Sequence, residues 1–363
     1  MNCLLRRMCA VCLLLIWPIS LAANDSAASV AVGGIVLTRQ PNISMESERL
    51  TISLSKITVE YEFLNESDAD ISTEVAFPIP AYEYTESAGG IRAFNDFRLW
   101  VDDQPLKYEV EAKAFLVKRD DRDRVVGQPR DVTAILNKYS IDIPSLGHFI
   151  DAKDYKVPDF DKLPPTSRKV LTEQGLVDAE SDGHTTPEWE VRKTYHWKQV
   201  FPAHKVLKVR HEYTPGFGFE GIQVAAFDPT SRSKFLKDYE ESAQYDLALL
   251  KDSCVEQSLQ KSVLTQASAA LKANPDNGYV GAAWVDYILT TANSWKTPIK
   301  KFDLVIERGP KRDKYAYQDD WTYASLCWDG KVSRVGPQHF EASETDFIPK
   351  KELKVLFLRM PGK

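Results

Sequence analysis

Apolar and polar residues alternate along two neighbouring stretches early in the chain. The segment 57–63 (ITVEYEF) has an apolar residue at every second position, and 73–77 (TEVAF) resumes the alternation. A period of two puts one face of a strand on a core and the other in water. Between them, the run 65–70 (NESDAD) has short side chains that hydrogen-bond their own backbone in turns. Pro78 and Pro80 then end strand pairing. This stretch therefore predicts a β-hairpin.

Two further hairpins are predicted by the same pattern. Residues 97–101 and 106–110 alternate on either side of the turn sequence DDQP. Residues 191–213 form a longer alternation that we expect to turn near Pro202 and Ala203. Successive antiparallel strands of this kind build β-sandwiches.

Helical spacing appears in two other regions. Residues 112–190 are rich in charge, Gly and Pro and contain two short helix-like segments, 131–139 with Asp131 as the cap and 166–176 with Thr166 as the cap. We interpret the region as an insertion packed on the sandwich, with a flexible linker as the alternative. Residues 231–271 form the longest helix-prone tract, which 274–278 (NPDNG) ends.

These patterns together predict a mainly β fold, an antiparallel β-sandwich with helical insertions, α+β overall. Strands return late in the chain, at 284–291, 302–307, 323–328 and 353–358. The expected organisation is a signal peptide (1–23), N-terminal sandwich strands (24–111), the insertion (112–190), a hairpin completing the sandwich (191–230), the helical tract (231–274) and a C-terminal β region (275–363).

The first residues have the form of a secretory signal. Arg6 and Arg7 precede the apolar run 8–16, and small residues follow. We expect cleavage between Ala22 and Asn24 and release to the periplasm or the medium. No later stretch approaches the ~20 apolar residues of a membrane-spanning helix, so no stable membrane span is expected after cleavage.

Charge and cysteine usage agree with an exported protein. Removing residues 1–23 removes two Arg and no acidic residue, so the formal net charge changes from −6 to −8. A mildly acidic chain without a long basic block argues against nucleic acid as a partner. Cys254 and Cys327 are the cysteines that remain, and in an exported protein two cysteines most simply form one disulfide. A reactive thiol pair is the rival interpretation, but the chain has no Cys-x-x-Cys.

Several ordered segments resemble the domain-of-unknown-function family 4424, a family of bacterial exported proteins. They lie at Asn24–Thr38, Ile43–Ser53, Glu74–Pro80 (EVAFPIP), His196–Gly218, Tyr287–Ile299 (YILTTANSWKTPI) and Thr345–Leu358 (TDFIPKKELKVLFL). The resemblance implies export and a β-rich fold, and it brings no catalytic residue with it. The N-terminal part is also distantly similar to VIT domains, through FPIP and the segment Phe97–Phe115.

Three of the six histidines fall in one predicted hairpin and raise the hypothesis of a metal site. If the turn centres near Ala203, His196 lies opposite Arg210, and His196 and His211 point to opposite faces. His204 would sit in the turn. We therefore expect no metal site here.

The chain lacks the common catalytic motifs. Gly-x-Ser-x-Gly and His-Glu-x-x-His are absent, and its glycine-rich stretches have neither the lysine nor the strand-to-helix setting of a phosphate loop. Paired carboxylates such as Asp102–Asp103 occur in turn-like contexts. No catalytic residue and no cofactor are predicted.

Aromatic side chains supply the candidate ligand contacts. Trp100 falls on the opposite face of its predicted strand from Leu99 and Val101, where an indole could stack on a sugar or be covered by a second layer such as the insertion. A second aromatic strip surrounds an acidic pair and contains Tyr315, Tyr317, Trp321 and Tyr323.

The function these features favour is a non-catalytic binding or structural module of the periplasm, whose partner is another envelope protein or a polysaccharide. The alternative is a hydrolase acting on an envelope carbohydrate or peptide, which should show a pocket holding two or more titratable groups with shifted pKa values. A binding module should instead show an exposed aromatic or apolar patch. A redox protein is a third hypothesis and requires a solvent-reachable Cys254–Cys327 pair.

Overall fold

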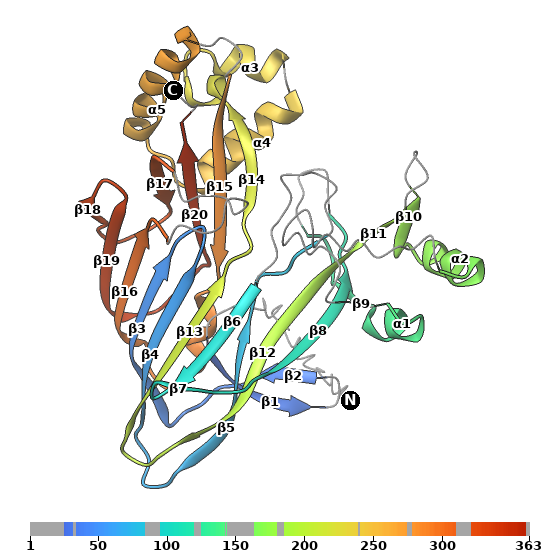
Figure 1. Ribbon diagram of the computed structural model, residues 1–363, viewed down its shortest axis with the longest axis vertical. Coiled ribbons are helices and arrows are strands. Elements are labelled where there is room, and N and C mark those ends of the chain that lie inside the picture. Colours follow the sequence, from blue (N-terminus) through green and yellow to red (C-terminus); the bar gives the residue numbers. More distant parts are fainter. Residues whose placement is uncertain are drawn as a thin grey trace, which may run out of the picture.

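The computed structural model describes residues 25–31, 34–83, 95–119, 125–141, 143, 163–179, 185–238, 240–273, 278–309 and 321–360. The predicted signal segment 1–23 lies outside these residues. Most of the described chain forms antiparallel β-sheets with a few helices, which confirms the predicted fold class (Figure 1).

The largest sheet has eight strands in the order β18-β19-β16-β3-β4-β13-β6-β7. Its members are β3 (Ile43–Ile52), β4 (Ile57–Asn65), β6 (Asn95–Val101), β7 (Gln104–Pro105), β13 (Val206–Thr214), β16 (Ile299–Glu307), β18 (Ser333–Gly336) and β19 (His339–Phe347). All neighbours are antiparallel except β16 and β3, which run parallel. Strands from the two ends of the chain therefore share one sheet.

A six-stranded sheet packs against this one, in the order β2-β1-β5-β12-β8-β9. Its members are β1 (Ser26–Ala31), β2 (Gly34–Leu37), β5 (Ile71–Pro78), β8 (Glu109–Leu116), β9 (Arg130–Asp131) and β12 (Trp189–Phe201). Aromatic pairs join the two sheets across the core. Phe77 of β5 contacts Phe97 of β6, and Tyr195 of β12 stacks on the same Phe97 at 4.3 Å between ring centroids.

Two of the predicted hairpins are wrong. β4 and β5 lie in different sheets, and so do β12 and β13, so each connection crosses from one sheet to the other. The Asn65 side chain ties the two crossings together, because its Nδ2 donates to the carbonyls of Ala69 and Phe201, both at 2.8 Å. Alternation fixes only which face of a strand is buried. Two strands can bury that face side by side or face to face, and here they lie face to face.

The third predicted hairpin is correct only over its turn. β6 pairs with the two-residue β7, with Trp100 opposite Pro105. The chain then leaves the eight-stranded sheet, and β8 pairs with β12 in the other sheet.

Within the insertion, the two predicted helices are present as α1 (Thr133–Lys138) and α2 (Pro165–Glu173), next to the small sheet of β10 (Val177–Ala179) and β11 (Thr185–Pro187). α1 packs on β8, where the Ala114 N–H donates to Thr133 Oγ1 at 3.0 Å. The predicted caps are displaced, since Val132 and Pro164 hold the two N-cap positions. Asp131 still accepts a hydrogen bond from the Thr133 N–H.

The helical tract forms a second layer at one end of the molecule (Figure 1). It consists of α3 (Arg232–Asp238), α4 (Glu240–Asp252) and α5 (Gln257–Ala273). These helices pack on a four-stranded sheet in the order β14-β15-β20-β17, made of β14 (Gly218–Gln223), β15 (Tyr279–Tyr287), β17 (Tyr323–Leu326) and β20 (Leu353–Arg359). Two 3-10 helices, η3 (Val224–Phe227) and η4 (Thr290–Ser294), complete the described elements.

β15 and β20 are buried on both faces. On β20, Leu356 and Leu358 pack among the helices, while Val355 and Phe357 belong to the core of the sandwich. The predicted disulfide is present between Cys254 and Cys327, with the two Cα atoms 5.0 Å apart.

Candidate functional site

An open cleft of about 280 Å³ lies beside the disulfide, where β17 and β19 end and β20 begins. It is lined by residues from three segments: Leu289; Cys327, Trp328, Asp329 and Gly330; and Glu344, Phe347, Ile348, Lys350, Lys351, Glu352 and Leu353. Ligand sites are usually concave, apolar and furnished with a few polar groups, and this cleft has that composition.

Aromatic rings form one side of the cleft. Trp328 stacks on Phe302 of β16 with ring centroids 5.7 Å apart, and its centroid lies 5.4 Å from that of Phe347 on β19. Phe302 and Phe347 stack on each other at 4.8 Å. The indole Nε1 donates to Glu344 Oε1 at 3.3 Å. The Trp328 side chain is therefore held both by its ring contacts with Phe302 and Phe347 and by the hydrogen bond from its indole N–H to Glu344.

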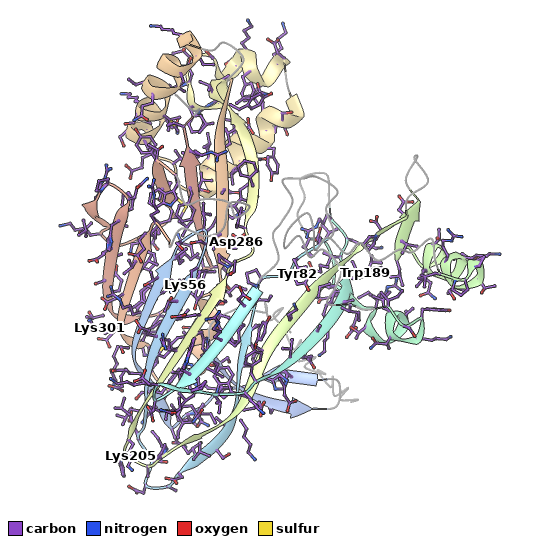
Figure 2. The ribbon with its side chains drawn as sticks, in the orientation of Figure 1. Lys56, Tyr82, Trp189, Lys205, Asp286 and Lys301 are labelled. Atoms are coloured by element: carbon purple, nitrogen blue, oxygen red, sulfur yellow. A yellow bond between two sulfur atoms is a disulfide. The ribbon has the colours of Figure 1, made fainter. Side chains whose placement is uncertain are left out.

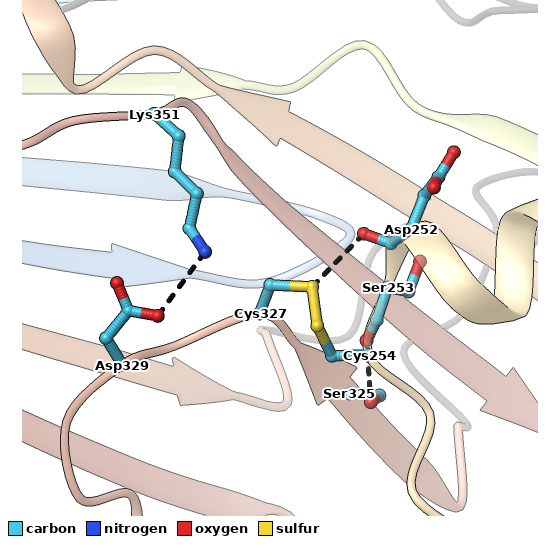
Figure 3. Close-up of a disulfide and its surroundings, with 7 residues drawn as sticks. All are labelled: Asp252, Ser253, Cys254, Ser325, Cys327, Asp329 and Lys351. Atoms are coloured by element: carbon cyan, nitrogen blue, oxygen red, sulfur yellow. Dashed lines mark hydrogen bonds and ion pairs between the residues drawn. A yellow bond between two sulfur atoms is a disulfide. The ribbon is translucent and has the colours of Figure 1, made fainter.

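The disulfide lies at the wall of the cleft, and Figure 3 shows it beside the Lys351–Asp329 pair. Cys254 is exposed at the junction of α4 and α5, and Cys327 directly follows β17 and lines the cleft. Ser325 Oγ donates to the Ser253 carbonyl at 2.9 Å, a second link between the same two segments. Both links hold the start of the 327–330 loop against the helical layer.

The charged side chains at the rim of the cleft differ in how many hydrogen bonds and ion pairs they form. Glu352 accepts hydrogen bonds from the Leu289 N–H at 2.8 Å and from Thr290 Oγ1 at 2.6 Å. Lys351 Nζ lies 3.6 Å from Asp329 Oδ1, and both side chains are more than half exposed. Lys350 is exposed and has no ion-pair partner among the residues the structure describes.

A second group of ionisable side chains is buried between the two large sheets. It contains Asp25, Glu48 and His211, which are at most 1% exposed, and the hydroxyl groups of Tyr61 and Tyr287, which lie 3.3 Å apart. Burial raises the pKa of Asp25, which the neighbouring Glu48 raises further. Burial lowers the pKa of His211 to about 3.

Asp25 and His211 illustrate the electrostatics of this group. Asp25 Oδ1 lies 3.5 Å from His211 Nε2, a distance that would suit an ion pair. The opposite pKa shifts favour the neutral form of both side chains, because removing charge from water here costs more than the pairing returns. This group is part of the core and does not line the cleft.

A family model described as "Domain of unknown function (DUF4424)" matches residues 23–356. The chain belongs to the DUF4424 family. No curated protein sequence matches it significantly. One similar solved structure is a Legionella pneumophila (strain Philadelphia 1) protein described as a candidate nutrient-binding protein, with 12% identity over 93% of this chain and 72% of that chain and a TM-score of 0.38. That similarity is too weak to carry an argument about fold or ligand.

Among the sequence-predicted contacts of this DUF4424 protein that the structure describes, Trp100 lies on β6, whereas Tyr323 begins β17 of a different sheet and Trp321 precedes that strand. Trp100 is half-buried in a separate depression of about 260 Å³ on the outer face of the eight-stranded sheet. The guanidinium carbon of Arg210 lies 4.1 Å from its ring centroid. Within the described residues of the insertion, α1 packs on β8 in the other sheet.

The second aromatic strip does not form a described surface. Trp321 is 1% exposed and belongs to the core. Tyr323 is half-buried and its hydroxyl accepts a hydrogen bond from Gln266 Nε2 at 2.6 Å. Tyr315 and Tyr317 lie outside the described residues.

The three histidines of the predicted hairpin in this DUF4424 chain have separate partners. His196 Nδ1 pairs with Glu74 at 2.7 Å, and His204 Nε2 pairs with Asp68 at 2.8 Å. The predicted register of His196 opposite Arg210 is wrong, because the two residues lie in different sheets; His196 lies opposite Ala76 and Glu109. Within the described ranges, no three His, Cys, Asp or Glu residues gather as metal ligands.

Of the residues that line the cleft of this DUF4424 protein, the sequence singled out Cys327 as a disulfide partner and none of the others as a candidate ligand contact. Trp328 follows a disulfide cysteine directly, and Ile348 stands two residues before a Lys-Lys pair at the end of a strand. These local signals exist. They could not be combined, because the cleft depends on which strand ends meet in space.

Proposed function

We propose that this DUF4424 protein is an exported, non-catalytic binding module of the bacterial envelope that takes its ligand in the disulfide cleft. One observation carries this proposal: the open cleft offers stacked rings and weakly engaged cations, whereas the carboxyl and imidazole groups with the strongest pKa shifts lie sealed in the core. Preformed aromatic and apolar surface in a concave site is typical of ligand recognition.

Export is supported by two features. The first residues have the pattern of a cleavable signal. The disulfide is typical of an oxidising compartment.

In the described part of the chain, no helix is both long and apolar enough to cross a membrane.

A fragment screen by ligand-observed NMR tests the binding proposal. The variant Ile348→Trp places a bulky ring at the mouth of the cleft, where Ile348 is 53% exposed. The matched control Val335→Trp adds the same ring to β18, where Val335 is 62% exposed and does not line the cleft. We expect fragments that bind the unmodified protein to be lost in Ile348→Trp and kept in Val335→Trp. Fragments that bind all three proteins equally would place the binding surface elsewhere.

A hydrolase is the second candidate, and one observation favours it. Glu220 of β14 has its pKa raised to about 7 by partial burial and by the nearby Asp246 of α4, a pattern seen in catalytic acids. Neither residue lines the two depressions described above. Hydrolysis of an envelope glycan or peptide that Glu220→Gln abolishes, while the protein stays folded, would favour the hydrolase over the binding module.

A further inference from the structure

We propose that the disulfide cleft binds a small amphipathic monoanion: a carboxylate carried on an aromatic ring or a branched aliphatic chain. This inference rests on the proposed function and adds the chemical class of the ligand. It follows from the size of the cleft, from its rings and from which charges at its rim are already engaged.

The size favours a small molecule. Ligand pockets usually enclose about 300–1,000 Å³, and this cleft of about 280 Å³ lies just below that range. A volume of that order accommodates one ring or one branched chain with a polar group.

The apolar side of the cleft favours a ring or a branched chain. Trp328 and Phe347 are held in place by stacking on Phe302, so their surfaces are ordered before a ligand arrives. Ile348 is 53% exposed at the mouth of the cleft. Preordered rings lose little conformational entropy on binding and give offset or edge contacts to a second ring.

The charge of the ligand's polar group is inferred from which charged side chains of the cleft already have partners. By formal count the lining carries three carboxylates and two ammonium groups, which taken alone would favour a cation. However, Glu344 accepts the indole N–H of Trp328, and Glu352 accepts from Leu289 and Thr290. Each hydrogen bond of this kind occupies part of the accepting capacity of the carboxylate.

The ammonium groups are engaged less. Lys351 is 3.6 Å from Asp329, whose side chain is 92% exposed, so this is a loose and hydrated pair. Lys350 has no ion-pair partner in the described part of the chain. A ligand carboxylate near Lys350 would form a charge-assisted hydrogen bond without breaking an existing contact.

Three compounds of nearly equal shape test the class: 3-phenylpropionate, its neutral amide and the cationic 3-phenylpropylamine. We expect the carboxylate to bind, the amide to bind about tenfold more weakly, as the loss of one charge-assisted contact implies, and the amine not to bind. Isothermal titration calorimetry and ligand-observed NMR on the full mature chain measure the series.

Two lysine variants make the test specific. Lys350→Gln should remove the difference between carboxylate and amide. Lys205→Gln should preserve it, because Lys205 is exposed in the connection between β12 and β13 and does not line the cleft (Figure 2). Circular dichroism on both variants confirms that they fold.

The possible failures are distinguishable. Equal binding of amide and carboxylate, preferred binding of the amine, or no binding of the carboxylate would overturn the ligand class. If fragments bind the unmodified protein and Ile348→Trp abolishes that binding, the proposed function stands even when the ligand class is wrong. If Ile348→Trp leaves every bound compound unaffected, both proposals are wrong.

Discussion

His211 is enclosed by rings from both sheets and has no exposed surface. Its imidazole meets Tyr61, Phe77 and Trp197 in edge-on contacts, with centroids between 4.9 and 5.6 Å away. An apolar environment of this kind excludes the imidazolium form, and burial accordingly lowers the pKa of His211 to about 3. Alternation could predict that His211 is buried or exposed on one face, but not that Asp25, far away in sequence, would lie beside it.

His211 makes the free energy of unfolding depend on pH. In the unfolded state the imidazole has its ordinary pKa of about 6.5. Below that pH the unfolded state binds a proton that the folded state does not bind, so the stability of the fold decreases as the pH falls. Between pH 7 and pH 5 this effect alone costs about 2 kcal/mol. His211→Phe keeps a ring in the site but removes the titrating group. Between pH 7 and pH 5, we expect its free energy of unfolding in urea denaturation to fall by about 2 kcal/mol less than that of the unmodified protein.

The exposed His204 provides the control. Its side chain is 61% exposed, so His204→Asn should retain the acid dependence of the unmodified protein. An unchanged pH slope in His211→Phe would show that other groups cause the acid sensitivity.

At the scale of elements, the strands were predictable and their partners were not. The alternations at 57–63, 73–77 and 191–213 correctly marked strands, and helical spacing marked α1 and α2. The connections after Asn65 and Phe201 turn between sheets because Asn65 bonds both crossings, a long-range contact that local turn chemistry does not reveal. The cysteine count predicted one distant contact correctly, since two cysteines in an exported chain have one pairing.

The disulfide is the element link with the clearest energetic consequence. It closes a separation of 73 residues, and the chain-entropy model assigns about 4 kcal/mol to such a loop. We expect the double variant Cys254→Ser/Cys327→Ser to be less stable by up to about 4 kcal/mol in urea denaturation. A reducing agent should lower the stability of the unmodified protein similarly and leave the double variant unchanged. Equal stability of the two proteins would show that the remaining contacts alone hold the 327–330 loop.

The whole molecule is joined through β16, β15 and β20. β16 inserts beside β3 in parallel, so late residues complete a sheet begun by early ones. β15 and β20 face the helices on one side and the sandwich on the other. The sequence predicted these strands. It did not predict the parallel pairing of β16 with β3, because partners about 250 residues apart leave no periodic signal, and the family resemblance did not supply that pairing.

This joining predicts one cooperative unfolding transition. Leu304 of β16 is 2% exposed between β3 and β19. Leu304→Ala should lower the stability of the entire chain by about 2–5 kcal/mol, the usual cost of a cavity in a core. Differential scanning calorimetry should show a single peak that shifts as a unit, whereas Val335→Ala on the exposed face of β18 should leave it in place. Two resolved peaks, only one of which moves, would contradict the joined core.

Fluorine NMR of the protein labelled with 5-fluorotryptophan tests whether a ligand binds at the disulfide cleft. Trp328→Phe assigns the resonance of Trp328, and Trp100→Phe assigns that of Trp100 on the outer face of the sheet. On titration with 3-phenylpropionate, we expect the Trp328 resonance to move and saturate while the Trp100 resonance stays fixed. A saturating shift of any other tryptophan with Trp328 unchanged would contradict binding at this cleft.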